Sequence, residues 1–224
     1  MKRARIATER DREIMWLAGT NGIIGFGQIK NQFFNLATDK TARARLSQLE
    51  KSGWLESFRT DARTRGESVF KLTEMGEKLF SRAERVRFMT ARAQEYKQQL
   101  AAIDARFKLA NQLEARGARL IDWKNEHELK SEYARLKHVE NVPQWQLDRL
   151  EMADARAIIQ EGNGQEVEID VEIDGAYYGK QLQEKVEKMG RGERPTLWVT
   201  TPDRAAKISG AIAPQAKMSL MIIG

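Results

Sequence analysis

The stretch TDKTARARLSQLEKSG, residues 38–53, decides the fold of the first part of the chain. Its apolar residues recur at helical spacing and predict one buried stripe, formed by Ala42, Leu46 and Leu49. Thr38 is placed to cap the helix, because its side-chain oxygen can accept a hydrogen bond from the amide of Thr41. Gly53 can end the helix in a left-handed conformation. The stretch therefore predicts a short helix with defined ends and one buried face.

The cations of this helix lie away from the buried stripe, at Lys40, Arg43 and Lys51. Two helices are predicted before it, the first capped by Thr8 and the second within residues 25–34. After it, the runs WLESFRT and SVFKLT alternate apolar and polar side chains, which predicts a β-hairpin whose tip carries Arg63 and Arg65. Three helices followed by a basic hairpin predict a winged helix-turn-helix domain over residues 1–76.

A winged helix-turn-helix suggests DNA binding, because its third helix enters the major groove and its hairpin contacts the backbone or the minor groove. The DNA-binding residues predicted on these two surfaces are Lys40, Thr41, Arg43, Lys51, Arg59, Arg63 and Arg65. Side chains early in the helix, Thr41 among them, are expected to read bases, while the cations bind phosphates. The same fold also serves as a protein-interaction module, and in that case the cations are only solvated.

Charge divides the 224-residue chain into a basic and an acidic part. The formal net charge is +6, but residues 1–120 carry +10 and residues 121–224 carry −4. This asymmetry suggests a nucleic-acid-binding module joined to a module with another task. The absence of cysteine excludes disulfides and thiolate-ligated metal sites. No apolar run is long enough to span a membrane, and we expect a cytoplasmic protein.

A long helix is predicted from its N-cap Thr73 to Gly117. Within it, apolar residues fall alternately three and four positions apart, at Val86, Met89, Ala93, Tyr96, Leu100, Ile103 and Phe107. This heptad pattern is typical of a two-helix interface, so residues 77–116 are predicted to form a coiled-coil connector in a homodimer. A two-fold dimer would match an inverted-repeat DNA site. The alternative is a long helix that packs on its own domains.

Beyond Gly117 the sequence alternates between two kinds of pattern. Five short apolar runs indicate strands: RLIDW, ADARAII, EVEIDVEI, TLWVTT and MSLMII. Helical patterns lie between them, in HELKSEYARLKH, YGKQLQEKVEKM and DRAAKISGAI. Strands that alternate with helices predict an α/β layer domain with a mixed sheet over residues 117–224. The fold class predicted for the whole chain is α+β.

Acidic residues concentrate on the predicted strands of this second domain. Asp154 begins one strand, and four acids occupy alternate positions of the next: Glu168, Asp170, Glu172 and Asp174. With a period of two, all four project to the same face. Clustered carboxylates could hold Mg²⁺ for phosphodiester hydrolysis. The alternative is a solvated outer face, with the intervening Val and Ile residues facing the core, and the alternation fits that reading without a metal.

Six segments carry a resemblance to a known family: TERDREIMWLAG, TARARLSQLEKSGWL, VFKLTEMGEKLF, MADA, VEIDGA and TLWVTTPDRAAKI. They resemble the replication-relaxation family of plasmid and mobile-element proteins over most of the chain. In that family a winged helix is followed by a C-terminal domain that resembles the PD-(D/E)xK restriction-endonuclease-like fold. The resemblance therefore implies a role in plasmid transfer or replication.

The resemblance also implies positions for a nuclease motif. Asp154 matches its first acidic position and Glu172 its second, and these two would be the metal ligands and catalytic carboxylates of an active enzyme. Asp174 stands where the motif has its lysine, and Met152 stands where a proline is usual. Lys185 on the following helix could supply the missing cation. Without it, the resemblance implies an inactive nuclease fold reused for binding, with no cofactor; Mg²⁺ would be needed only by an active enzyme.

These observations predict a dimeric protein that binds double-stranded DNA at a specific sequence. Its role would be that of an accessory factor in the mobilisation or replication of a plasmid or conjugative element, and its partner could be a relaxase or another transfer or replication protein. Two alternatives stay open. One is a Mg²⁺-dependent nuclease or nickase that uses the C-terminal domain. The other is a dimeric winged-helix transcriptional repressor.

Overall fold

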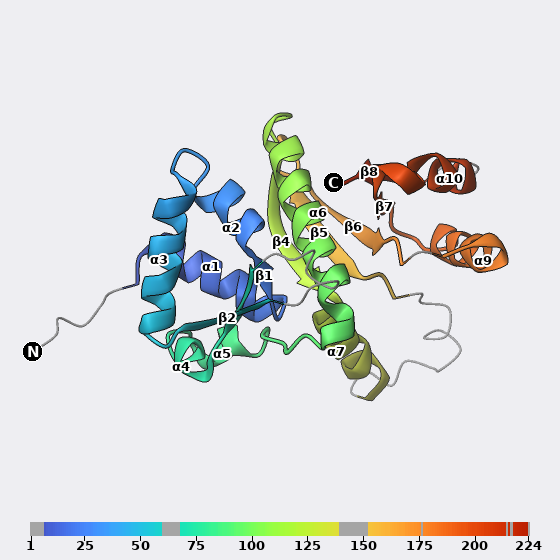
Figure 1. The fold of residues 1–224 in the computed structure, drawn as a ribbon. Helices are drawn as coiled ribbons and strands as arrows, with labels where there is room; N and C mark the ends of the chain where they lie inside the picture. Colours follow the sequence, from blue (N-terminus) through green and yellow to red (C-terminus); the bar gives the residue numbers. More distant parts are fainter. Residues whose placement is uncertain are drawn as a thin grey trace, which may run out of the picture. The chain divides into compact units, whose positions relative to one another are not determined.

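The protein consists of two compact units, residues 1–103 and 104–224, and its class is α+β. The computed structural model describes most of the chain and is drawn in Figure 1. The described residues are 7–59, 68–138, 152–175, 177–213, 215 and 217–223. Within them, no helix is both long and apolar enough to cross a membrane.

The first unit begins with three helices, as the sequence predicts. They are α1 (Glu9–Thr20), α2 (Phe26–Phe33) and α3 (Asp39–Lys51), with the two-residue strand β1 (Ile24–Gly25) before α2. Thr8 caps α1 in a capping box with Asp11, since each side chain accepts a hydrogen bond from the other residue's amide. Thr38 caps α3 by accepting from the amide of Thr41 at 3.3 Å, and Gly53 follows the helix at φ +72°. Both predicted ends of α3 are therefore confirmed.

A small antiparallel sheet completes this part of the unit. The strands β2 (Leu55–Arg59) and β3 (Ser68–Leu72) pair over their whole length, and β1 adds to the other side of β3. The core between sheet and helices contains side chains with no exposed surface, including Ile14, Ile24, Ile29, Ala42 and Val69. Leu46 and Leu49 are 1% exposed, so the stripe predicted for α3 is buried.

The sequence predicts a single helix from Thr73 to Gly117, and this prediction is wrong. The structure has four shorter elements instead: α4 (Glu74–Glu77), α5 (Arg82–Arg85), the 3₁₀ turn η1 (Ala93–Glu95) and α6 (Tyr96–Glu114). Thr73 does cap a helix, but Ser81 starts a new one in a capping box with Glu84. The rings of Trp16, Phe80 and Phe88 then pack together with centroids 5.1–6.0 Å apart. These aromatic contacts fold the segment back onto α1, and helical propensity alone does not reveal them.

The residues of the predicted dimer seam do not line one face of a helix. Val86 is 75% exposed in the turn after α5. Met89, Ala93 and Leu100 pack against a cluster formed by Ile23, Ala91 and Tyr96. Ile103 is fully buried and Phe107 is half-buried. The side chains from Met89 to Leu100 thus serve the first unit's own core, which is the alternative that the sequence left open.

The second unit is a five-stranded mixed sheet with helices. Its order is β4-β5-β6-β7-β8, antiparallel from β4 to β6 and parallel from β6 to β8. All five predicted strands are confirmed, as β4 (Arg119–Asn125), β5 (Ala155–Gln160), β6 (Glu166–Ile173), β7 (Thr196–Thr200) and β8 (Met218–Ile222). The predicted helices are confirmed as α7 (Glu126–His138), α9 (Gly179–Gly190) and α10 (Pro202–Ile212).

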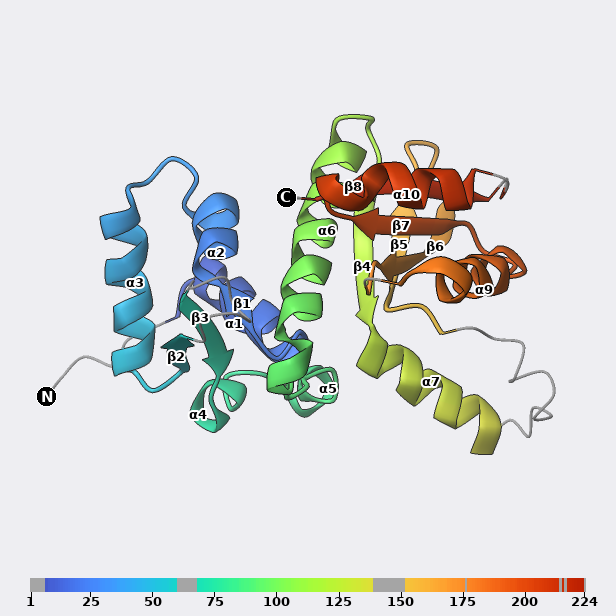
Figure 2. The same ribbon diagram turned by 45° about the vertical axis from the view of Figure 1, so that its right-hand side comes forward.

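Helices α9 and α10 lie side by side on one face of this sheet (Figure 2). Their apolar side chains enclose Trp198 of β7, which has no exposed surface, and they include Leu182, Val186, Met189, Ile208 and Ile212. The C-terminal half of α6 buries a second stripe, formed by Ala105, Leu109 and Leu113. Lys108 of that half donates to the carbonyl of Ile222 at 2.6 Å, which places it beside β8.

Candidate functional site

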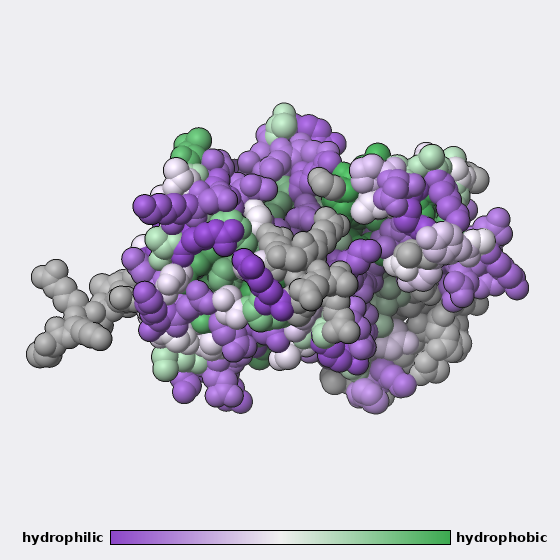
Figure 3. Space-filling model, in the orientation of Figure 1, coloured by the Kyte–Doolittle hydropathy of each residue, from purple (hydrophilic) through white to green (hydrophobic). Residues whose placement is uncertain are grey.

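The outward face of α3 carries the exposed polar residues expected from the sequence. Lys40, Thr41, Arg43 and Lys51 are all exposed, whereas Ala42, Leu46 and Leu49 lie on the buried face. Hydrophilic side chains predominate over α3 in the space-filling view (Figure 3). The helix therefore presents three cations on one rigid, well-capped element.

Arg43 is held in place by an aromatic ring. Its guanidinium carbon lies 3.8 Å from the centroid of the Phe26 ring, and Phe26 begins α2. The contact is a cation–π interaction, which restricts the long side chain while leaving its N–H groups available. Arg43 thus reaches solvent from a defined position, and no pattern in the sequence predicts this contact.

Arg45 has a different role, because it turns inward and binds Asp11 of α1. Its Nε donates to Asp11 Oδ1 at 2.9 Å, and its Nη2 donates to Asp11 Oδ2. Burial alone would raise the pKa of Asp11, but the hydrogen bonds from Arg45 and Thr8 and the guanidinium charge outweigh it and lower this pKa below 3.8. The ion pair attaches α3 to α1, so Arg45 is a structural residue.

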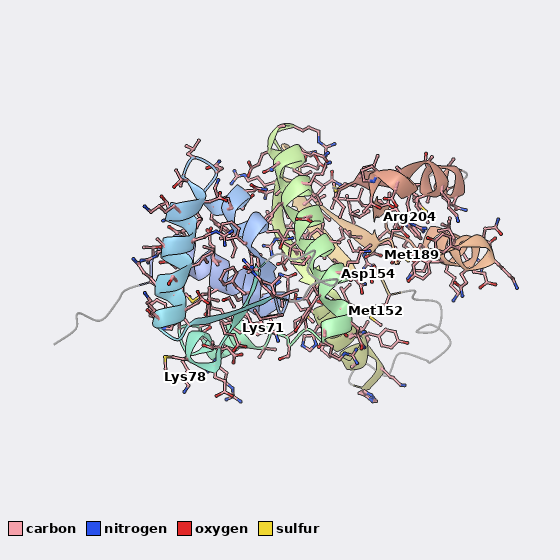
Figure 4. All side chains as sticks on the ribbon, viewed as in Figure 1. Lys71, Lys78, Met152, Asp154, Met189 and Arg204 are labelled. Atoms are coloured by element: carbon pink, nitrogen blue, oxygen red, sulfur yellow. The ribbon has the colours of Figure 1, made fainter. Side chains whose placement is uncertain are left out.

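The hairpin is only partly described. Arg59 at the end of β2 is exposed, and its Nε donates to Ser68 Oγ of β3 at 3.2 Å. Arg63 and Arg65 lie outside the described residues. Lys71 of β3, labelled in Figure 4, lies over the rings of Phe58 and Tyr96 at 4.8 and 5.5 Å. Of the three cations predicted for the hairpin, the described residues include Arg59.

Glu168, Asp170 and Glu172 occupy alternate positions of β6, and Asp174 follows the strand directly. Each of these four acids has a basic partner. Asp170 accepts from Arg156 Nε at 2.8 Å, and Glu168 accepts from Arg194 Nε at 2.6 Å. Glu172 pairs with Lys185, and Asp174 pairs with Arg204. Burial alone would raise the pKa of Glu168, but the hydrogen bond and charge of Arg194, together with the charges of Arg156 and Lys124, outweigh it and lower this pKa. The acids thus form a row of ion pairs. The expectation of a solvated outer face is wrong for Asp170, Glu172 and Asp174, whose side chains are 14%, 0% and 4% exposed, whereas Glu168 keeps 41% of its side chain exposed.

Glu172 occupies the most enclosed position in this row. Its side chain has no exposed surface, and its Oε1 lies 3.2 Å from Lys185 Nζ of α9. On the neighbouring strand, Asp154 accepts a hydrogen bond from the amide of Ile173 at 2.8 Å. The structure therefore brings Asp154, Glu172 and Lys185 to the same end of the sheet, as the motif comparison predicts.

Asp174, at the position of the motif lysine, is bound by an arginine from α10. Arg204 donates to both carboxylate oxygens, at 2.5 and 2.9 Å, and also to the carbonyl of Tyr177 at 2.7 Å. Thr200 at the end of β7 donates to Asp174 Oδ2 at 2.8 Å. The hydrogen bond to Asp174 raises the pKa of Arg204. Arg204 and Asp154 are labelled in Figure 4. Sequence reasoning missed Arg204, because only the fold brings α10 to the end of β6.

Asp154, Glu172 and Asp174 each contact another group of the protein. Among the described residues, no three His, Asp or Glu side chains are grouped so that they could hold an ion. Asp154 accepts from a backbone amide, and Glu172 and Asp174 are paired with cations. A hard cation such as Mg²⁺ takes oxygen ligands, so it would compete with these partners for the carboxylates.

Comparison with known proteins covers both units. The comparison with curated proteins finds no match. The model of one family, described as replication-relaxation, matches residues 18–202. The matched segment contains α3, β6 and Lys185 and ends at the first residue of α10. This match suggests a role in the replication or relaxation of a plasmid or other mobile element. The chain belongs to the replication-relaxation family.

Proposed function

We propose that the protein binds double-stranded DNA at a specific sequence, with α3 as its recognition helix. The observation that carries the proposal is the division of α3 into two faces. One face is buried and attached to α1 through the Asp11–Arg45 pair, and the other presents Lys40, Arg43 and Lys51 to solvent. A polyanion with regularly spaced phosphates complements such a face.

The arrangement of the first unit supports a winged helix-turn-helix. Its element order is α1-β1-α2-α3-β2-β3, with the sheet order β1-β3-β2. In this fold the third helix enters the major groove, and the hairpin between the last two strands contacts the backbone. Thr41, exposed in the first turn of α3, would then face base edges, while the cations would bind phosphates.

Family membership supports an accessory role in mobilisation or replication. A protein of this kind would mark an origin on the plasmid or conjugative element and present it to a relaxase or another replication protein. The second unit supports this role as a binding module. Glu172 and Asp174 form ion pairs, and Asp154 accepts a hydrogen bond from a backbone amide. We therefore propose that the second unit does not cut DNA.

One experiment tests both parts of the proposal. The purified protein is incubated with a supercoiled plasmid that carries the DNA neighbouring its own gene, with and without Mg²⁺. Footprinting reports binding, and gel analysis of the same samples reports nicking. A protected site in intact plasmid is the expected result, and a site at a promoter would instead favour the repressor. Mg²⁺-dependent nicking that Asp154→Ala abolishes would show that the second unit is a nuclease.

A further inference from the structure

An exposed tyrosine contacts two cations on the second unit. Tyr178 directly precedes α9 and is 59% exposed. The guanidinium carbon of Arg204 lies 4.5 Å from the centroid of its ring, and Lys207 Nζ lies 4.2 Å from the same centroid. Both cations come from α10, so the contacts join the beginnings of two neighbouring helices.

Arg204, the more buried of the two cations, is held in a fixed position. Arg204 is held by the two oxygens of Asp174 and by the carbonyl of Tyr177, and its side chain is 13% exposed. It therefore supports the ring of Tyr178 and contributes little free charge of its own. The ring is held on a rigid base, and it still has more than half of its surface in solvent.

The lysines around this ring are open to solvent. Lys207 is exposed on α10, and Lys180 in the first turn of α9 has a side chain that is 88% exposed. Lys180 lies 3.4 Å from Glu184, but an ion pair this exposed contributes little stability and exchanges readily with other anions. The surface thus combines an aromatic ring that is more than half exposed with two positive charges that are open to solvent.

We propose that Tyr178, Lys180 and Lys207 form a binding surface for single-stranded DNA. A base would stack on the free surface of the Tyr178 ring, and the two lysines would bind the adjacent phosphates. Aromatic side chains with nearby cations bind single strands in this way without reading sequence, because every base has a π-face. A duplex does not fit as well, because its bases are stacked inside the helix and cannot reach the ring.

This surface is separate from α3, so the two sites can be tested independently. The inference and the proposed function both have DNA as the partner, but they concern different sites. An experiment can therefore contradict one of them without contradicting the other. Loss of duplex binding in an α3 variant would not affect single-strand binding by the second unit. Single-strand binding that depends on Arg43 and not on Tyr178 would overturn the inference and leave the proposed function intact.

The test measures binding of a fluorescein-labelled oligothymidylate to the full chain by fluorescence anisotropy. Tyr178→Ala is expected to weaken binding about tenfold, as for the loss of one base stack, and Lys207→Ala to weaken it to a smaller extent. Tyr178→Phe keeps the ring and is expected to bind as the wild type does. Lys188→Ala is the matched control, because Lys188 is exposed near the other end of α9.

Two results would overturn the inference. The first is equal affinity of the wild type and Tyr178→Ala for the oligothymidylate. The second is an equal loss in Tyr178→Phe and Tyr178→Ala, which would assign the effect to the hydroxyl group and exclude stacking. Duplex binding by each variant is measured alongside and should be unchanged, and thermal unfolding of each variant shows that the second unit is folded.

Discussion

Lys185 Nζ lies 3.2 Å from Glu172 Oε1, and the glutamate side chain has no exposed surface. A carboxylate in such a position is stable only with a counter-charge, because transfer of an isolated charge out of water is very unfavourable. The family resemblance suggests Glu172 for an acidic position of a nuclease motif, and Lys185 of α9 as a residue that could supply the missing cation. The structure provides that cation at that place and uses it to neutralise the carboxylate.

Removing one partner of this pair is expected to destabilise the second unit. We expect Lys185→Met to lower the free energy of unfolding by about 3 kcal/mol, because it leaves Glu172 charged and buried. The double variant Glu172→Met with Lys185→Met is expected to recover most of this loss. Urea unfolding followed by tryptophan fluorescence measures both. A Lys185→Met protein as stable as the wild type would contradict the account of the pair.

The stability of the folded protein at low pH depends on Asp11. The pKa of Asp11 is lowered in the folded protein, so its ionised form stabilises the fold above the ordinary value of 3.8, and this contribution is lost as the pH falls through the folded-state pKa. We expect Asp11→Asn to lower stability at neutral pH and to flatten the decline of stability below about pH 4. Urea unfolding at a series of pH values measures this. Asp39→Asn, which removes an exposed carboxylate from α3, is the control and should keep the wild-type slope.

The ring of Phe26 is expected to contribute to DNA affinity through Arg43. Phe26→Leu keeps an apolar side chain in this nearly buried position but removes the cation–π contact. Such a contact is worth about 0.5–1 kcal/mol, so binding should weaken roughly two- to fivefold. In the Arg43→Ala background the same substitution should have no further effect. Equal losses in both backgrounds, measured by anisotropy with a duplex, would show that Phe26 acts by some other route.

Substitution of a glycine by alanine should have opposite effects on stability at Gly76 and at Gly210. A Cβ on Gly76 would lie 2.3 Å from the carbonyl oxygen of Trp54, whereas a Cβ on Gly210 meets nothing within 4 Å. Gly76→Ala should therefore destabilise the first unit by about 3 kcal/mol. Gly210→Ala should stabilise the second by up to about 1 kcal/mol, because alanine favours the helix. Thermal unfolding compares the two, and a stabilised Gly76→Ala protein would contradict the packing around α4.

The sequence predicted those elements whose signals are local. Thr38 and Gly53 mark the ends of α3 by cap chemistry, and the stripe through Leu46 follows from helical periodicity. The strand β6 was visible because apolar and acidic residues alternate along it. Such patterns depend on neighbours in the chain, and the structure confirms them.

The predictions failed where tertiary contacts decide the structure. The heptad pattern around Tyr96 came from residues that serve the core of the first unit, and heptad spacing does not distinguish that core from a second chain. The partners of Asp174 and Glu172 come from helices that follow in the sequence, and only the parallel crossovers bring Arg204 and Lys185 to the same end of the sheet. Alternation alone therefore predicts a solvated row of acids, although Glu172 and Asp174 are buried with their partners.

The central claim is that the outward face of α3 binds the phosphates of duplex DNA. The most direct test is the salt dependence of duplex affinity for the wild type, Arg43→Ala and the control Arg85→Ala, which removes an exposed cation from α5. We predict that log affinity falls steeply with log salt, and that Arg43→Ala reduces the slope by about 1 while Arg85→Ala does not change it. A flat salt dependence, or wild-type binding by Arg43→Ala, would contradict the claim.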